Sequence, residues 1–547
     1  MPIHPLAGQP APASVLIDVD TLLAAYENVP DPSVPEQRVS FGTSGHRGNP
    51  FALSFNAAHL HAIAQAVCDY RAAHGIDGPP YIGGDTHALS RPAYDSALEV
   101  LAANGVAVLA SLDDEFVPTP ALSLAIVMHN RGRSSGFADG IVITPSHNPP
   151  DNGGIKYNPT HGGPADTDVT RWIEQRANGY LQNKLAGVKR VPLAQARSAP
   201  TTRPFDFLSL YVTELEHAVD FDAIRAAGIK MGVDPLGGAG VHYWPRIAER
   251  YRLKLDVVNA AVDPRFAFLT LDWDGKIRMD PSSSYAMQRL IGMKDRYDVS
   301  FACDTDHDRH GVVAPSVGLM PSNHYLSILA YTLFTTRPQW PKEAALAKTV
   351  VSTALLDRIA AKLCRPLYEA PVGFKWFAQG LLDGKLGFAC EESAGASVLR
   401  RDGGTWTTDK DGIVPALLSA ELMARSGRDP GEMYRALTHE LGEPHSHRVE
   451  GAANAAQRKA LGALKASELK LDSLAGEKVI ASLDRAPGNG APIGGIRVSV
   501  PSGWFAARPS GTEDIYKIYG ESFRDEAHLH ALLSKAQRVV DAALRER

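Results

Sequence analysis

A pattern that occurs three times along the 547-residue sequence constrains the fold more than any other feature. Each time, a short run of apolar and β-branched residues leads into an Ala- and Leu-rich stretch of helical period, and a second apolar run then ends in a polar loop. Such alternation of strand and helix patterns is typical of α/β domains. The paired runs cover residues 81–85 and 140–143, residues 229–234 and 297–303, and residues 348–352 and 386–390.

The repetition predicts three diverged copies of one α/β unit, because a chain of this length needs more than one hydrophobic core. Beyond about residue 440 the pattern changes. An Ala-, Lys- and Leu-rich segment near 455–470, a Pro- and Gly-rich stretch at 487–495 and a strand-like run at 496–500 predict a smaller α+β domain. If the three units contain parallel sheets, their polar loops leave the carboxyl ends of strands, where ligands bind. We therefore expect the chemistry of the chain to face one cleft.

Composition limits the classes of partner. The 56 basic and 61 acidic residues give a net charge of -5, which argues against nucleic acid or an anionic membrane as a partner. The sequence contains no apolar run of 18 residues and no leader pattern, so we expect a cytoplasmic protein that does not span a membrane. The cysteines form no C-x-x-C pair, which favours a reducing compartment; they are Cys68, Cys303, Cys364 and Cys390.

The first polar loop contains a candidate nucleophile, Ser146, directly after an apolar run and between Pro145 and His147. We expect this serine to be exposed, because the loop is too polar and too rich in proline to continue a strand or to start a helix. A nucleophilic serine needs a group that removes its proton and a group that stabilises developing negative charge. His147 and Lys156 are nearby candidates. The alternative interpretation is an ordinary turn serine beside a loop histidine.

The second loop alternates three carboxylates, Asp304, Asp306 and Asp308. In an extended or gently turning segment these side chains fall on one side and converge on one hard cation. A calcium-binding EF-hand is excluded, because Arg309 and Pro315 stand where that loop needs glycine and glutamate. Three protein oxygens leave positions for water or phosphate oxygens, as magnesium prefers. The alternative is a solvated turn without a metal.

Three further loops contain groups that suit a sugar phosphate. Glu391 and Ser393 offer an acceptor and a donor for sugar hydroxyls, and Arg47 stands between glycines in a turn that suits a phosphate contact. Near the C-terminus, a guanidinium, two hydroxyls and a glycine backbone form a possible phosphate cradle; these residues are Arg508, Ser510, Gly511 and Thr512. Each of these loops alone is also compatible with an ordinary turn.

Taken together and in this order, the loops resemble those of the α-D-phosphohexomutase superfamily, and most closely those of bacterial phosphoglucomutases of similar length. The resemblance covers roughly residues 40–525, and its most specific parts are Thr-Pro-Ser-His-Asn-Pro at 144–149 and Arg-Pro-Ser-Gly-Thr-Glu at 508–513. It implies four domains around a central cleft, three similar α/β domains and a smaller C-terminal α+β domain. The implied division is 1–39 (N-terminal extension), 40–205, 206–321, 322–440 and 441–547.

The resemblance also implies a role for individual residues. Ser146 is the expected phosphoserine, and its phosphate together with Asp304, Asp306 and Asp308 is expected to bind one Mg²⁺ per chain. The implied catalytic residues are Ser146, Lys156, His147, Arg47 and Arg309, with Lys156 as the first choice for proton transfer. The implied substrate-binding residues are Glu391, Ser393, Gly373, Lys375, Lys410, Arg508, Ser510, Gly511 and Thr512.

Three positions depart from the family pattern. Thr305 and His307 stand where the aspartate loop often has glycine, and Val372 replaces a common threonine. We expect metal binding to survive these changes, which affect the local geometry of the aspartate loop and the sugar contact inferred at Val372.

The implied activity is that of a phosphoglucomutase, an isomerase of glucose metabolism that interconverts α-D-glucose 1-phosphate and glucose 6-phosphate through a glucose 1,6-bisphosphate intermediate. A phosphomannomutase or an enzyme of dual specificity is an alternative, because glucose and mannose phosphates differ only at carbon 2. A metal-dependent sugar phosphatase with Asp304 as nucleophile is another, although Asp308 stands where such enzymes usually have threonine or valine. A phosphosugar-binding protein without activity is the third. The sequence does not indicate an oligomeric state.

Overall fold

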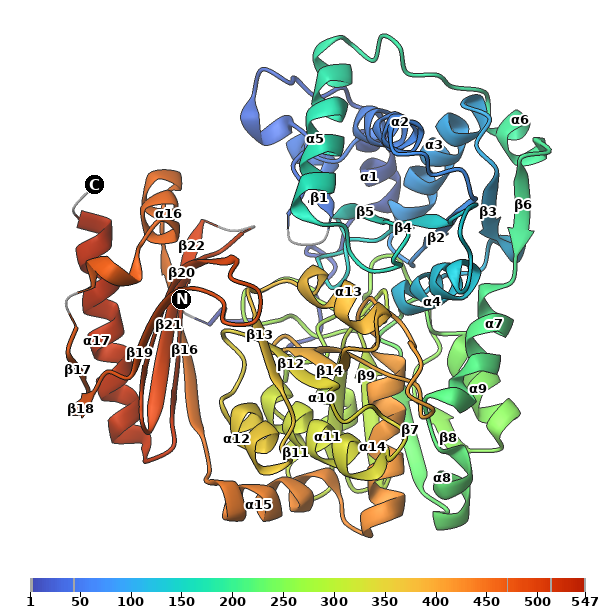
Figure 1. The fold of residues 1–547 in the computed structure, drawn as a ribbon. Coiled ribbons are helices and arrows are strands. Elements are labelled where there is room, and N and C mark those ends of the chain that lie inside the picture. The colour runs from blue at the N-terminus through green and yellow to red at the C-terminus, as the bar shows by residue number, and fades with distance from the viewer. Residues whose placement is uncertain (1–2, 43–44, 470, 512–513, 546–547) are drawn as a thin grey trace.

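A computed structural model of the chain describes residues 3–42, 45–469, 471–511 and 514–545. This part of the chain forms four domains, each built around its own sheet (Figure 1). The first three are α/β domains, and the last is an antiparallel sheet with helices on one face. The predicted fold class is therefore confirmed.

The first domain contains a six-stranded sheet in the order β1-β5-β4-β2-β3-β6. Its strands are β1 (His46–Gly48), β2 (Pro80–Gly84), β3 (Val108–Ser111), β4 (Asp139–Ile143), β5 (Gly153–Asn158) and β6 (Thr202–Phe205). Its helices are α2 (Ala57–Ala73), α3 (Ser90–Ala103), α4 (Thr119–Asn130), α5 (Thr167–Gln182) and α6 (Leu193–Ser198). The strands bury alternate side chains on opposite faces, because successive side chains of a strand point in opposite directions. Ile82, Ile141 and Ile143 join the core formed with α2 and α3, whereas Tyr81 and Val142 join the core that includes α4.

The second domain has five strands in the order β11-β10-β9-β7-β8. They are β7 (Lys230–Asp234), β8 (Lys254–Val257), β9 (Val299–Cys303), β10 (His310–Ala314) and β11 (Gly318–Leu319). The helices are α7 (Phe207–Glu214), α8 (Phe221–Ala227), α9 (Tyr243–Tyr251) and α10 (Gln288–Gly292). A long connection between β8 and α10 packs on the sheet through its own apolar cluster, which includes Phe266, Leu271 and Met279.

The third domain has four strands in the order β13-β12-β14-β15. They are β12 (Ala345–Thr349), β13 (Leu367–Ala370), β14 (Leu386–Glu391) and β15 (Gly395–Val398). Its helices are α11 (Ser322–Thr336), α12 (Leu355–Lys362), α13 (Lys375–Leu382), α14 (Ile413–Ser426) and α15 (Pro430–Leu441).

The three α/β domains share one topological feature that explains the repeated sequence pattern. In each, two neighbouring parallel strands are followed by an antiparallel strand that pairs with the second of them: β2, β4 and β5; β7, β9 and β10; β12, β14 and β15. The hairpin connections of these three units are the serine loop (144–152, between β4 and β5), the aspartate loop (304–309, between β9 and β10) and the glutamate loop (392–394, which follows Glu391 at the end of β14). The sheets are therefore mixed rather than purely parallel, but each loop does leave the carboxyl end of a strand, as the sequence predicts.

The fourth domain is a five-stranded antiparallel sheet in the order β16-β22-β21-β20-β19. The strands are β16 (His445–Ala452), β19 (Ala481–Arg485), β20 (Pro492–Val500), β21 (Gly503–Pro509) and β22 (Ile515–Ser522), and β17 (Ser473–Leu474) pairs with β18 (Glu477–Lys478). The helices α16 (Ala455–Gly462) and α17 (Glu526–Arg545) lie on the same face of this sheet (Figure 1). Val498, Phe505 and Ile518 pack in the core with α17.

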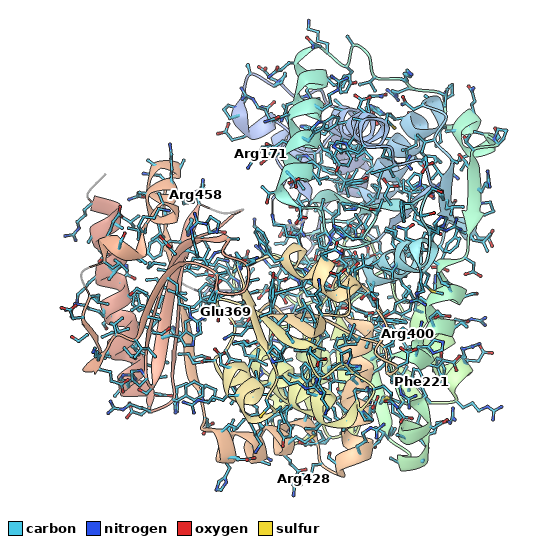
Figure 2. All side chains as sticks on the ribbon, in the orientation of Figure 1. Arg171, Phe221, Glu369, Arg400, Arg428 and Arg458 are labelled. Atoms are coloured by element: carbon cyan, nitrogen blue, oxygen red, sulfur yellow. The ribbon has the colours of Figure 1, made fainter. Side chains whose placement is uncertain are left out.

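The other face of the fourth sheet meets the third domain. Trp504 and Tyr519 form an apolar cluster with Val350 and Val351. At the edge of this contact, the Arg497 guanidinium donates to the carboxylate of Glu369, a buried ion pair; Glu369 is labelled where the two domains meet (Figure 2). The fourth domain is thus attached by both apolar and ionic contacts.

The N-terminal segment lies against two domains. Pro10 forms a β-bridge with Thr270 of the second domain, and Tyr26 of α1 (Val19–Tyr26) bonds to Ser96 in the first. Short 3₁₀ helices cover Pro35–Gln37, Pro50–Ala52, Leu112–Asp114, Leu215–His217 and Ala466–Glu468. Among the described residues, no helix has the length and apolar character needed to cross a membrane.

Candidate active site

The hairpin loop that follows β4 holds Ser146 in an unusual backbone conformation. The φ angle of Ser146 is 58°, in the left-handed region, which costs a non-glycine residue about 1–3 kcal/mol. Its N–H donates to Thr144 Oγ1 at 2.8 Å, and its Oγ donates to Asp304 Oδ2 at 2.7 Å. The prediction that Ser146 is exposed is wrong: its exposed fraction is 0 %. The loop is polar, but the aspartate loop of the second domain covers it.

The aspartate loop after β9 is a tight turn rather than an extended segment. Oδ1 of Asp304 accepts the backbone N–H groups of Asp308 and Arg309, both at 3.1 Å, which folds the loop back on its first carboxylate. One carboxylate oxygen from each of Asp304, Asp306 and Asp308 lies within 4.8 Å of the others, and all three residues are buried. The convergence that the sequence predicts is therefore present, although a turn produces it.

Two oxygens in this cluster test whether it fits a cation. Asp306 Oδ1 and Asp308 Oδ1 are buried, and neither accepts a hydrogen bond from any residue that the structure describes; Arg309 Nε lies 3.7 Å from Asp308 Oδ1, beyond hydrogen-bond distance. A buried carboxylate oxygen without a donor is costly unless a cation compensates it. Oxygen donors from closely spaced carboxylates are the ligands that Mg²⁺ prefers. The site therefore fits Mg²⁺.

His307 explains one departure from the family pattern. Its φ angle is 59°, a conformation that glycine adopts without strain and that other residues adopt rarely. The ring is fixed from outside the loop, because Nε2 accepts the indole N–H of Trp244 at 3.1 Å. Gly240 packs directly against the same ring, and a Cβ there would lie 2.1 Å from Nε2. These contacts hold the turn although a side chain occupies the glycine position.

Two lysines compensate the charge of the aspartates. Nζ of Lys156, from β5, lies 2.7 Å from Asp306 Oδ2 and 3.2 Å from Asp308 Oδ2. Nζ of Lys410 also lies 3.2 Å from Asp308 Oδ2. Burial alone would lower the pKa of Lys156, but the two aspartates outweigh burial and raise it, so that this lysine is charged. The lysines in turn hold the pKa of Asp308 well below its usual range against the opposing effect of burial.

Asp304 behaves differently from its neighbours. Burial and the charges of Asp306 and Asp308 raise its pKa well above the usual range. Its oxygens accept hydrogen bonds from Ser146 and from two backbone N–H groups. The cluster therefore has an excess of negative potential near Ser146, which a bound cation would relieve.

His147 lies next to the serine hydroxyl. Its Nδ1 is 3.4 Å from Ser146 Oγ, and burial together with the positive charge of Arg309 lowers its pKa to about 3. The imidazole is therefore neutral near pH 7 and available as a proton acceptor. Arg47, from β1, donates to the Asn148 side chain at 3.4 Å in the same loop.

The glutamate loop approaches the same place from the third domain. Arg309 forms a β-bridge with Gly395, which joins the second domain to this loop. Glu391 Oε1 accepts the N–H of Gly373 at 2.9 Å, and Glu391 Oε2 lies 3.9 Å from Lys410 Nζ. Burial raises the pKa of Glu391.

Two predicted sugar-binding residues lie at the margin of this site. Ser393 is half-buried in the turn after β14. Lys375, at the start of α13, donates from Nζ to Thr167 Oγ1 at 2.6 Å and thus contacts the first domain rather than the aspartates. Val372, the third departure from the family pattern, packs at the margin of the apolar cluster between the third and fourth domains.

The predicted phosphate cradle belongs to the fourth domain. Arg508 lies at the end of β21, the backbone N–H of Ser510 donates to Ile515 O at 2.8 Å, and Gly511 is exposed. Thr512 lies outside the described residues. Tyr519 lies within electrostatic reach of both Glu392 of the glutamate loop and Arg508 of the cradle. Burial and the negative charge of Glu392 raise the pKa of the Tyr519 phenol to about 12, whereas the positive charge of Arg508 acts to lower it.

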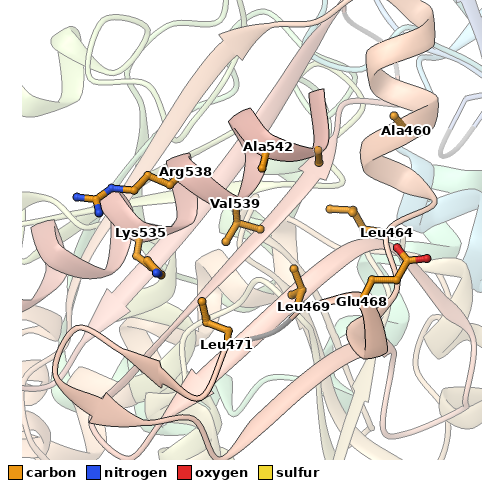
Figure 3. Close-up of a pocket in the computed structure, with 10 residues that line it drawn as sticks. Ala460, Leu464, Glu468, Leu469, Leu471, Lys535, Arg538, Val539 and Ala542 are labelled. Carbon is orange, nitrogen blue, oxygen red and sulfur yellow. The ribbon is translucent and has the colours of Figure 1, made fainter. Parts of the chain in front are cut away.

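Two hollows lie in or beside the fourth domain. One, of about 410 Å³, is lined by Glu392, Arg448, Trp504 and Tyr519 where the third and fourth domains meet. The other, of about 330 Å³, lies between α16 and α17 and is lined mainly by apolar side chains such as Leu464, with charged groups at its rim (Figure 3). Among the described residues, none of those predicted for the site lines this second hollow.

Three residues at the site were not found from the sequence. Thr119, the first residue of α4, donates from Oγ1 to Asp306 Oδ2 at 2.6 Å. Asp280 is half-buried in the long connection of the second domain, where His147 and Arg309 outweigh the effect of desolvation and lower its pKa. Asp409 accepts from the Asn158 side chain at 3.0 Å. No local pattern marks these residues, since tertiary contacts alone bring them to the site.

Comparison with known proteins agrees with this geometry. Family models for phosphoglucomutase/phosphomannomutase α/β/α domains I, II and III match residues 38–184, 209–317 and 321–441. A phosphoglucomutase of Komagataeibacter xylinus is 53% identical over 541 residues, which cover 99% of this chain and 98% of that protein. The chain therefore belongs to the phosphoglucomutase/phosphomannomutase family.

Solved structures agree with the fold. Parafusin, a phosphoglucomutase from Paramecium solved in an open form, matches with a TM-score of 0.71 at 20% identity and covers 94% of this chain and 96% of its own. A family protein from Burkholderia thailandensis matches with a TM-score of 0.68 at 21% identity, with 93% and 98% covered. At such identities the likeness is one of fold.

Proposed function

We propose that this chain is a phosphoglucomutase that interconverts α-D-glucose 1-phosphate and glucose 6-phosphate through a phosphorylated Ser146 and a glucose 1,6-bisphosphate intermediate. The observation that carries the proposal is the buried hydrogen bond from Ser146 Oγ to Asp304, inside a cluster of three carboxylates and two lysines. The 53% identity to a bacterial phosphoglucomutase over nearly the whole chain supports the glucose substrate.

In the proposed reaction, the free hydroxyl of the bound sugar monophosphate attacks the phosphorus of phosphorylated Ser146. The bond between phosphorus and Ser146 Oγ breaks, and a new bond to the sugar oxygen forms, which yields the bisphosphate. After this intermediate has turned over, its other phosphate is transferred back to Ser146 Oγ. Each half reaction moves one phosphoryl group and one proton, so no water is consumed and no free phosphate is formed.

The residues around Ser146 fit distinct parts of this reaction. Neutral His147, 3.4 Å from Ser146 Oγ, is placed to hold or return the hydroxyl proton. Charged Lys156 stabilises negative charge on the group in transit and is suited to donate rather than accept a proton. Asp304, Asp306 and Asp308 would hold Mg²⁺, which when bound neutralises charge on the phosphoryl oxygens.

The remaining site residues are proposed to bind the sugar phosphate. Glu391, with Ser393 beside it, would accept and donate hydrogen bonds at sugar hydroxyls, and Gly373 and Lys410 hold Glu391 in place. In the fourth domain, the cradle would hold the phosphate that is not in transit; it comprises Arg508, Ser510, Gly511 and Thr512. A site that grips a phosphate at a distance from Ser146 accepts either end of the bisphosphate.

One observation disfavours the phosphatase alternative. Asp304 Oδ1 accepts two backbone N–H groups, and Oδ2, the oxygen left to attack phosphorus, faces the Ser146 hydroxyl at 2.7 Å, so Ser146 occupies the place that a phosphatase would leave open for its substrate. The discriminating experiment follows conversion of glucose 1-phosphate and of mannose 1-phosphate with a coupled dehydrogenase, in magnesium with trace glucose 1,6-bisphosphate, while free phosphate is measured. Preferred conversion of glucose 1-phosphate without phosphate release is expected. Stoichiometric phosphate release would overturn the proposal, and equal rates would replace it with dual specificity.

Two further statements belong to this proposal. We propose domain limits at residues 40–205, 206–321, 322–440 and 441–547, after an N-terminal extension of 1–39. We also propose a cytoplasmic location with a small hexose phosphate as the ligand. The four cysteines are all unpaired, as expected in a reducing compartment.

A further inference from the structure

Two buried polar residues that no step of the proposed reaction uses lie next to the serine loop. Asp85 and His87 occupy the connection between β2 and α3 and are only 4 % and 3 % exposed. Because β2 and β4 are parallel neighbours, the loops that leave their carboxyl ends lie side by side, and the Asp85 N–H donates to Ile143 O at 3.1 Å. The pair is thus adjacent to the segment that contains Ser146.

Asp85 accepts four hydrogen bonds. Oδ1 accepts from the Ser90 hydroxyl and from the N–H of His87, and Oδ2 accepts from the Thr144 hydroxyl at 2.6 Å and from His87 Nδ1 at 2.9 Å. A carboxylate has about four acceptor positions, so these contacts fill all of them. Since the Thr144 hydroxyl donates to Asp85, its oxygen is fixed as the acceptor for the N–H of Ser146.

His87 holds the same loop at a second point. Its Nε2 lies 3.1 Å from the carbonyl oxygen of Asn148, and its Nδ1 faces Asp85. The ring therefore bridges the Asp85 carboxylate and the backbone of the serine loop at Asn148. The Phe266 ring from the second domain, at 5.2 Å between centroids, covers this pair.

We propose that Asp85 and His87 are a positioning pair that keeps the serine loop in its left-handed conformation at Ser146, with Oγ directed at Asp304. Asp85 acts through Thr144 on the residue that carries the strain, and His87 fixes the loop two residues further on. Neither side chain touches the reacting atoms. The proposal rests on the proposed role of Ser146 for its effect on turnover, but its effect on loop conformation does not.

The first test uses Asp85→Asn, which keeps the size of the side chain but replaces one oxygen with an amide that donates. At least two of the four hydrogen bonds are then lost. We expect kcat with glucose 1-phosphate to fall by about 10- to 100-fold, as for other residues that orient a reacting group, with KM unchanged within about two-fold. His87→Ala should act in the same direction, and His87→Gln should regain part of the loss, because its amide can donate to the Asn148 carbonyl.

The matched control is Asp139→Asn. Asp139 is a buried carboxylate of the same domain that pairs with Arg71 at 2.9 Å and does not contact the serine loop in the described structure. The Asp139→Asn substitution should lower the thermal midpoint without lowering the kcat of the folded enzyme. Equal loss of activity in Asp85→Asn and Asp139→Asn would overturn the proposal, because the effect would then be general destabilisation.

A second readout separates this inference from the proposed function. Hydrogen exchange of the peptide that spans 144–149, measured by mass spectrometry, should quicken in Asp85→Asn and His87→Ala and not in Asp139→Asn, whatever the reaction catalysed. Unchanged exchange in the first two variants would overturn the positioning role. If the wild type shows no mutase activity while exchange changes as expected, the proposed function fails and the positioning role stands.

Discussion

Replacing Lys156 with methionine should lower kcat and at the same time raise the affinity for magnesium. Methionine keeps most of the length and apolar contacts of lysine but removes the ammonium that lies 2.7 Å from Asp306 and 3.2 Å from Asp308. The ammonium and a bound cation compete for the charge of the same carboxylates. Its loss therefore leaves more negative potential for the metal.

The distances set the size of the effect. At an effective dielectric constant of about 20, unit charges at these separations attract by about 5–6 kcal/mol each, before the cost of burying the ammonium is subtracted. Removing one partner of a buried ion pair costs about 3–5 kcal/mol in practice. If bound magnesium recovers about half of this lost stability in Lys156→Met, roughly 2 kcal/mol, the variant binds magnesium about 30-fold more tightly than the wild type. Loss of the charged donor should lower kcat by about 10²- to 10⁴-fold.

Isothermal titration of magnesium into metal-free wild type and Lys156→Met measures the affinity, and thermal unfolding with and without magnesium measures the recovery of stability. Lys385→Met is the control, because Lys385 pairs with Asp383 at the surface and is 74% exposed, so its removal should change neither quantity appreciably. Equal or weaker magnesium binding by Lys156→Met would refute the argument that lysine and metal share the aspartates.

Three other outcomes follow from the structure. Arg508→Ala should raise KM for glucose 1-phosphate by about 10-fold or more while the thermal midpoint stays constant; an unchanged KM would remove Arg508 from the phosphate cradle. Glu421→Gln should destabilise the protein at neutral pH, because Arg337 binds Glu421 at 2.6 and 2.9 Å and holds its pKa below 4.5 against the opposing effect of burial. A carboxyl group whose pKa is lower in the folded than in the unfolded state stabilises the protein at pH values above the unfolded pKa. The difference in thermal midpoint between wild type and Glu421→Gln should therefore vanish as the pH falls through the folded pKa; a difference that grows in acid would contradict this. Thr119→Val should weaken magnesium binding by about 10-fold and Thr119→Ser should not, since the hydroxyl donates to Asp306; calorimetry would show it, and equal affinities would count against the contact.

The sequence was most informative where chemistry and local structure coincide. The runs before the serine, aspartate and glutamate loops proved to be β4, β9 and β14, because apolar strands that end in polar residues are a local pattern. The convergence of Asp304, Asp306 and Asp308 was also predictable, since the three are close in sequence.

What the sequence did not reveal depends on contacts between domains. Ser146 was expected to be exposed, and only the approach of Asp304 from the second domain, 158 positions away, buries it. Thr119 and Asp280 reach the site through the packing of α4 and of a long connection, for which no periodicity or motif exists. His307 was recognised as a departure from glycine, but the hydrogen bond that holds its ring comes from Trp244 on α9, which no pattern near His307 indicates.

The central claim is that Ser146 carries the phosphoryl group. The most direct test is incubation of the enzyme with glucose 1,6-bisphosphate labelled in its phosphates, followed by peptide mass spectrometry and a chase with unlabelled glucose 1-phosphate. The account predicts label on Ser146 that the chase removes into hexose phosphate, and no label in Ser146→Ala. Label on another residue, or turnover by Ser146→Ala at the wild-type rate, would contradict it.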